Sequence, residues 1–119
     1  MKAILIIVNA APYGNERMLS ALRLATAIVD QELEPVDVRL FMMSDAVTVG
    51  LASQGDSESG GGLQEMLKEL TRRGVPIRLC RTCAQMRGIA GATLVPGVAI
   101  GTLPELAAWT LAADKVITF

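Results

Sequence analysis

The amino-acid sequence predicts an α/β domain built on a parallel β-sheet. Short apolar runs rich in β-branched residues alternate along the chain with segments whose apolar residues recur at helical spacing. The first run, residues 3–8, is continuously apolar, as in strands that are buried on both faces of a parallel sheet. Strands that alternate with helices are joined by right-handed crossovers. The 119 residues suit a single domain, residues 1–119, around one core.

The first part of the chain predicts a strand, a helix and a second strand. Residues 3–8 form the first strand, and residues 9–15, which include a proline and a glycine, form a loop. An amphipathic helix is expected over residues 16–31, because its apolar residues recur every three or four positions. Residues 36–41 alternate between apolar and polar side chains, which predicts the second strand.

The middle of the chain predicts a loop between two helices. Residues 45–51 are expected to form a short helix. Residues 52–62 are rich in glycine, serine and acidic residues and predict a flexible loop, which in a compact domain is either functional or disordered. The apolar spacing after residue 62 predicts a helix that ends at Gly74, where a left-handed cap is expected.

The last third predicts three further strands. Residues 75–79 form the third strand, and a short helix follows over residues 80–87. A strand is expected around residues 98–100, and residues 115–119 form the closing strand. Between these two strands, Thr102 begins a capping box that opens a helix running to about residue 113.

Composition excludes several classes of function. The chain carries 11 basic and 12 acidic residues, so it lacks the basic field that nucleic acid binding requires, and only 3% of its residues are aromatic. Histidine is absent, which excludes Ser-His and Cys-His triads and every histidine-ligated metal site. We therefore expect no metal, no cofactor and no nucleic acid partner.

The apolar character of the chain predicts self-association. Apolar residues make up 51% of the sequence, and 11 glycines come in addition, which exceeds the roughly 45–50% of ordinary domains. A small monomer cannot bury so much apolar surface, so a homo-oligomer is expected. No apolar run approaches the roughly 20 residues of a membrane span, and the first run is too short for a signal peptide. A cytoplasmic protein without a membrane partner is expected.

The chemistry of the chain is concentrated in Cys80 and Cys83. The pair stands where the third strand is expected to end and a helix to begin, and ligands collect at that edge of a parallel sheet. Amide groups of the first helical turn are expected to lower the pKa of Cys80. Cys83 lies three residues later, on the same helical face. A thiolate in this position favours attack on a sulfur donor or a disulfide.

Three other interpretations of the cysteine pair stay open at this point. The cysteines are small buried hydrophobic residues in the first of them. A structural zinc site is the second, and it would have to be shared between subunits because the chain offers only two thiolates and no histidine. The third is a redox pair like that of thioredoxin, which fits the spacing but lacks the aromatic residue before the first cysteine.

Five other side chains are candidates for the same site. Arg81 stands between the two cysteines and Arg87 follows them, and both supply positive charge. Asp45 follows the second strand on the same edge of the sheet. Tyr13 and Asn15 follow the first strand and are candidates for lining the same pocket.

These features resemble the DsrE/DsrF-like family, including its YchN-type proteins. The resemblance covers nearly the whole chain, with the region around Cys80 as its most specific part. The matching segments are PYGNER at 12–17, RLFMMSDAV at 39–47, CRTCAQMRGI at 80–89 and ADKVITF at 113–119.

The resemblance implies both an architecture and an activity. It implies a single three-layer domain with a mainly parallel sheet of about five strands, assembled as homotrimers or hexamers. In the sulfur-relay members of the family, a cysteine at the position of Cys80 accepts sulfur as a persulfide and passes it to a partner. Sulfur donor and acceptor proteins are therefore expected partners.

The leading hypothesis is a small sulfur carrier or sulfurtransferase in which Cys80 forms the persulfide. Cys83 either resolves this persulfide through a disulfide or only packs. The alternatives are a redox module that cycles between dithiol and disulfide, and a non-catalytic oligomeric scaffold or ligand-binding subunit.

Overall fold

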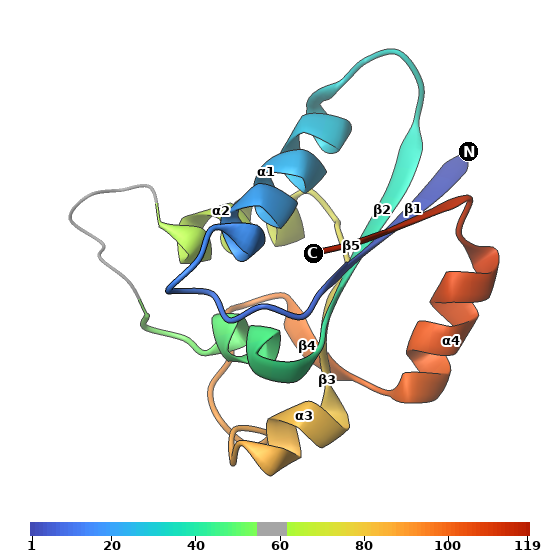
Figure 1. Cartoon of the computed structure of the whole chain (residues 1–119). Helices are drawn as coiled ribbons and strands as arrows, with labels where there is room; N and C mark the ends of the chain where they lie inside the picture. The colour runs from blue at the N-terminus through green and yellow to red at the C-terminus, as the bar shows by residue number, and fades with distance from the viewer. Residues whose placement is uncertain (55–61) are drawn as a thin grey trace.

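A parallel sheet forms the centre of the computed structural model, which describes residues 1–54 and 62–119 (Figure 1). Within these residues the sheet has five strands in the order β4-β3-β2-β1-β5, and each neighbouring pair is parallel. The strands are β1 (Lys2–Val8), β2 (Val36–Met42), β3 (Ile77–Cys80), β4 (Val98–Gly101) and β5 (Lys115–Thr118). The predicted α/β class with its parallel sheet is confirmed.

Helices lie on both sides of this sheet. Figure 1 shows α1 and α2 together on one face and α4 on the opposite face, while α3 and the 3₁₀-helix η1 lie beyond the strand ends. Their bounds are α1 (Arg17–Asp30), η1 (Ser44–Gly50), α2 (Leu63–Arg72), α3 (Arg81–Met86) and α4 (Leu103–Ala112). The three layers follow from the chain order, because each crossover must place a helix on one face or the other.

The core lies between the sheet and the α1–α2 layer. Met18, Leu22 and Leu67 are fully buried there, as the helical spacing of apolar residues predicts. Ile6 of β1 and Leu40 of β2 are partners in the sheet, and both are also buried on this face. The strands β1 and β2 run in register from Lys2 opposite Val36 to Val8 opposite Met42, so their carboxyl ends reach the same edge.

The structure differs from the prediction at the third strand, at the helix that follows it and at the short helix near residues 45–51. The third strand begins at Ile77 rather than at residue 75, because Pro76 has no N–H and joins the ladder only through its carbonyl, which accepts from Leu40 N. The strand also includes Cys80, so the following helix begins at Arg81. The short helix expected near residues 45–51 is a 3₁₀-helix, η1. The loop predicted at 52–62 falls mostly outside the described residues, which omit 55–61.

The predicted caps are present. Gly74 follows α2 with φ +85°, a left-handed conformation that glycine adopts without steric cost. The Oγ atom of Thr102 accepts the Glu105 N–H at 3.3 Å and so caps α4.

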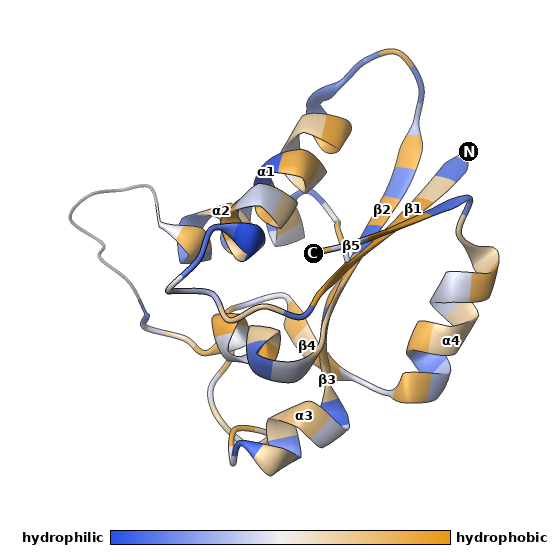
Figure 2. Cartoon of the chain, viewed as in Figure 1, coloured by the Kyte–Doolittle hydropathy of each residue, from blue (hydrophilic) through white to orange (hydrophobic). Residues whose placement is uncertain are grey.

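Helix α4 is the most exposed apolar element. None of its residues is fully buried, and Leu103 and Leu111 are 60% and 89% exposed. Figure 2 shows apolar colouring along this helix and along β1. In the described part of the chain, no helix combines the length and the hydrophobicity needed to cross a membrane.

Candidate functional site

Cys80 stands at the carboxyl end of β3 and is the N-cap residue of α3. It lies opposite Gly101 of β4 in the sheet, and its strand neighbours β2, which ends at Met42. The backbone turns sharply at this point, because Cys80 keeps an extended conformation (ψ 122°) and Arg81 is already helical. The predicted position of Cys80, at the edge where a strand passes into a helix, is confirmed.

The Cys80 side chain is buried and turned over the first turn of α3. The residue is only 4% exposed, and its Sγ accepts the N–H of Cys83 at 3.5 Å. Burial raises the pKa of the Cys80 thiol above its ordinary value, and hydrogen bonds from the backbone amides of Cys83 and Thr82 only partly oppose this effect. The sequence-based expectation of a lowered pKa is therefore wrong, because desolvation outweighs the amide donors.

Cys83 is half-buried and reaches the segment that follows β2. Its Sγ accepts the N–H of Ser44 at 3.2 Å. Ser44 has φ +53°, a left-handed conformation that is uncommon outside glycine. Sequence reasoning missed Ser44, because its contribution is a backbone N–H that its side chain does not reveal. Its place directly after the second strand, beside Asp45, was the available signal.

Arg87 ties the same segment to the end of α3. Its guanidinium pairs with the Asp45 carboxylate at 2.8 Å, donates to the Cys83 carbonyl at 3.1 Å and reaches Ser44 Oγ at 3.5 Å. The sequence placed Asp45 and Arg87 at one edge of the sheet, and the structure brings them into contact. This ion pair is partly exposed, so it positions the two segments more than it stabilises the fold.

The three remaining candidate residues do not join this network. Arg81 is exposed at the start of α3. Tyr13 is 52% exposed. Asn15 is engaged in its own loop, where its side chain donates to the Ala11 carbonyl at 3.2 Å and accepts the Arg17 N–H at 2.9 Å.

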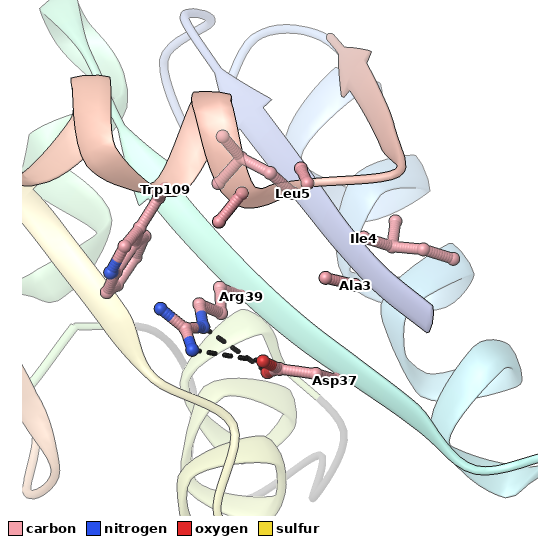
Figure 3. A pocket seen from close by; sticks show the side chains of 8 residues that line it. Ala3, Ile4, Leu5, Asp37, Arg39 and Trp109 are labelled. Atoms are coloured by element: carbon pink, nitrogen blue, oxygen red, sulfur yellow. Dashed lines mark hydrogen bonds and ion pairs between the residues drawn. The ribbon is translucent and has the colours of Figure 1, made fainter. Parts of the chain in front are cut away.

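A separate small pocket lies between α4 and the first halves of β1 and β2 (Figure 3). Its volume is about 30 Å³, room for roughly one water molecule. Trp109 lines the pocket. The guanidinium carbons of Arg39 and Arg78 lie 5.1 and 5.6 Å from the centre of the Trp109 ring. Asp37 pairs with Arg39 at 3.0 Å. Because β1 and β2 contribute their amino-terminal residues, this pocket lies away from the cysteine edge.

Comparison with known proteins identifies the family. A model of the DsrE/DsrF-like family matches residues 2–119. The chain belongs to this family. It is 54% identical to the protein YchN of Escherichia coli K12 over 119 residues, which cover both chains completely. The crystal structure of YchN superposes on this chain with a TM-score of 0.93 over the full length of both.

More distant relatives extend the comparison. MTH1491 of Methanobacterium thermoautotrophicum, 17% identical, shares the fold with a TM-score of 0.77 over the full length of both chains. A protein of Salmonella newport named sulfurtransferase TusD is 30% identical over 125 aligned residues, covering 96% of this chain and 97% of TusD.

Proposed function

We propose that this DsrE/DsrF-like chain is a sulfur-relay protein that carries sulfane sulfur as a persulfide on Cys80. The observation that carries the proposal is the position of Cys80 at the carboxyl edge of the sheet, where it is the N-cap of α3 and where Cys83 contacts the segment after β2. Family membership and the likeness to a protein named as a sulfurtransferase support a sulfur-relay role at the level of the family. Cys80 and Cys83 are both free thiols, which suits a reducing cytoplasm.

The proposed reaction is an exchange at sulfur. The Cys80 thiolate attacks the outer sulfur of a donor persulfide R–S–SH, the S–S bond of the donor breaks, and R–S⁻ leaves. Cys80–S–SH results, and a partner thiolate takes its outer sulfur by the same exchange. The burial of Cys80 shields the inner sulfur of the persulfide from water and external thiols between these two steps. The N–H groups around the site are donors for the negative charge of the persulfide.

Cys80→Ser is expected to abolish sulfur uptake, whereas Cys83→Ser is expected to retain it. The protein is reduced, treated with sodium tetrasulfide and examined at once by intact mass spectrometry. Each added sulfur contributes about 32 Da and is removed by dithiothreitol. Serine at position 80 can still accept the Cys83 N–H as an N-cap, so this variant is expected to fold.

Three outcomes separate the proposal from its alternatives. A gain of about 32 Da in Cys83→Ser that is absent in Cys80→Ser supports the carrier. Equal uptake by the two variants would contradict the role of Cys80. No gain in either variant would leave a scaffold or ligand-binding subunit as the better interpretation.

We also propose that the exposed face of α4 assembles the chain into a homo-oligomer, a trimer or a hexamer. Leu111 is 89% exposed on this helix, and Val116 of the neighbouring edge strand β5 is 43% exposed. Exposed apolar side chains that gather in this way are typical of protein interfaces. Donor and acceptor proteins for sulfur remain further proposed partners.

Leu111→Glu is expected to shift the assembly toward the monomer. A carboxylate buried in an apolar interface lacks a partner, so its desolvation opposes association by several kcal/mol. Leu33 is 94% exposed in the turn between α1 and β2, and Leu33→Glu is the matched control with an unchanged assembly. Analytical ultracentrifugation measures the two masses. A monomeric unmodified protein at micromolar concentration would contradict the proposed assembly.

A further inference from the structure

We propose that Cys83 turns the carrier into a sulfide-releasing protein by displacing HS⁻ from the Cys80 persulfide. This inference rests on the proposed function, because it begins from Cys80–S–SH. It concerns the fate of the carried sulfur, which leaves as sulfide when no acceptor takes it as sulfane sulfur.

Burial restricts access to the inner sulfur of the persulfide. The inner sulfur is Sγ of Cys80, a residue that is 4% exposed. An attack on this atom releases the outer sulfur as sulfide, and a thiol from solution would have to enter the protein to make it. The chain contains two cysteines, so Cys83 is the other thiol that the protein itself supplies. External thiols are thus limited to the outer sulfur, and the inner sulfur is left to Cys83.

The geometry of α3 brings Cys83 to the same side as Cys80. Residues three apart in the first turn of a helix share a face. The backbone N–H of Cys83 already donates to Cys80 Sγ at 3.5 Å, so the Cys80 sulfur lies directly over the residue that would attack it. The Cys83 side chain has a single heavy-atom rotation, about its Cα–Cβ bond. A disulfide therefore requires a small movement within one helical turn rather than a rearrangement of the fold.

Hydrogen bonds from Ser44 and Arg87 fix the position of Cys83 before it reacts. The Ser44 N–H donates to Cys83 Sγ at 3.2 Å, and Ser44 itself has a left-handed backbone conformation. Arg87 donates to the Cys83 carbonyl at 3.1 Å and pairs with Asp45, which fixes the Ser44 segment against α3. A cysteine that served only as packing would not need a donor aimed at its sulfur. The contact with Ser44 keeps the Cys83 sulfur in a defined place from which it can turn.

The proposed step balances without an external oxidant. Cys83 first loses its proton to solvent, and its thiolate attacks Cys80 Sγ. The Cys80–S–SH bond breaks, and its electron pair leaves with the outer sulfur as HS⁻. The outer sulfur is reduced to sulfide and the Cys83 sulfur is oxidised, while the Cys80 sulfur exchanges its bond to the outer sulfur for the bond of the Cys80–Cys83 disulfide. A dithiol reductant then restores both thiols and closes the cycle.

The test follows a preloaded persulfide in the absence of oxygen. Reduced wild type and Cys83→Ser are loaded briefly with sodium tetrasulfide at mildly alkaline pH, where Cys80 forms its thiolate, and are then transferred to cold, mildly acid buffer, which slows further thiolate attack, and desalted. Raising the pH starts the reaction. Wild type is expected to lose the added mass of about 32 Da, to end about 2 Da below the dithiol mass and to release about one sulfide per loaded chain. Dithiothreitol should return it to the dithiol mass.

Cys83→Ser is expected to keep its persulfide under the same conditions, with sulfide release at least tenfold lower. A wild-type persulfide that persists as long as that of Cys83→Ser would overturn the inference while leaving the carrier function intact. A Cys83→Ser protein that never gains the sulfur would instead contradict the carrier function itself. Cys83→Ala repeats the comparison without a hydroxyl and excludes an effect of the serine oxygen.

Discussion

Phe41→Ala is expected to lower the free energy of unfolding by about 3–5 kcal/mol, the usual cost of truncating a buried phenylalanine. Phe41 is fully buried in the central strand β2, and its ring meets Trp109 edge-on with the centroids 6.0 Å apart. The substitution removes this contact and leaves a cavity under α4. The substitution also loosens the strand whose carboxyl end presents Ser44 to the cysteines.

The other phenylalanine of the chain provides the control. Phe119 is only partly buried and directly follows β5. Its backbone N–H donates to the Ile7 carbonyl, and this hydrogen bond survives truncation of the side chain. Because the loss scales with the apolar area removed from the core, Phe119→Ala is expected to cost less than half as much. Urea unfolding followed by circular dichroism at one protein concentration measures both values. Equal losses would show that the α4 side of the sheet is not a packed core around Phe41.

The sequence predicts elements well where a local pattern decides the structure. The helical spacing around Met18 and Leu22 depends on which side chains can reach a common face, and the structure buries both residues. Gly74 and Thr102 are local signals of the same kind, because a left-handed cap and a side-chain N-cap involve only neighbouring residues. Pro76 is a position where local patterns are not enough. Whether this residue belongs to the third strand depends on its hydrogen bonding with the neighbouring strand, which the local sequence does not reveal.

The candidate site was predictable as a location but not as an electrostatic environment. Cys80 and Asp45 both follow strands, so parallel topology alone brings them to one edge. The pKa of Cys80 depends on how deeply β3 places the thiol, and no local pattern reports burial of that kind. Because the pKa of Cys80 is raised, a smaller fraction of this thiol is ionised at neutral pH than of an ordinary thiol, and sulfur uptake is expected to increase as the pH rises.

Groups at the cysteine edge have hydrogen-bond or ion-pair partners within the chain, whereas the α4 side exposes apolar side chains. At the cysteine edge, Asp45, Arg87 and the Ser44 amide are engaged with one another or with Cys83. On the α4 side, apolar side chains such as Leu111 face outward. The candidate site and the apolar face of α4 lie on different sides of the molecule, so the proposed assembly through α4 would not use the residues of the proposed sulfur site.

Gly97→Ala is expected to destabilise the protein by about 2–5 kcal/mol, for two separable reasons. Gly97 has φ +91°, and a side chain in a left-handed conformation costs roughly 1–2 kcal/mol. A Cβ atom at this position would also lie 2.6 Å from Cβ of Thr71, which the Thr71 hydroxyl contact with the Pro96 carbonyl holds in place. Overpacking of this kind costs about 1–3 kcal/mol more. The loop that leads into β4 would have to move away from α2.

Gly14→Ala carries only the conformational cost, so comparison with Gly97→Ala gives the cost of the contact with Thr71. Gly14 has the same φ of +91°, but a Cβ there meets no heavy atom within 4 Å, so only the conformational cost applies. The difference between the two variants in urea unfolding therefore measures the contact between the β4 loop and Thr71. A difference of about 1–3 kcal/mol is expected. Equal losses would mean that α2 yields freely at Thr71. In that case the loop before β4 would not be fixed by packing, and the strand that flanks Cys80 would owe its position to its ladder with β3 alone.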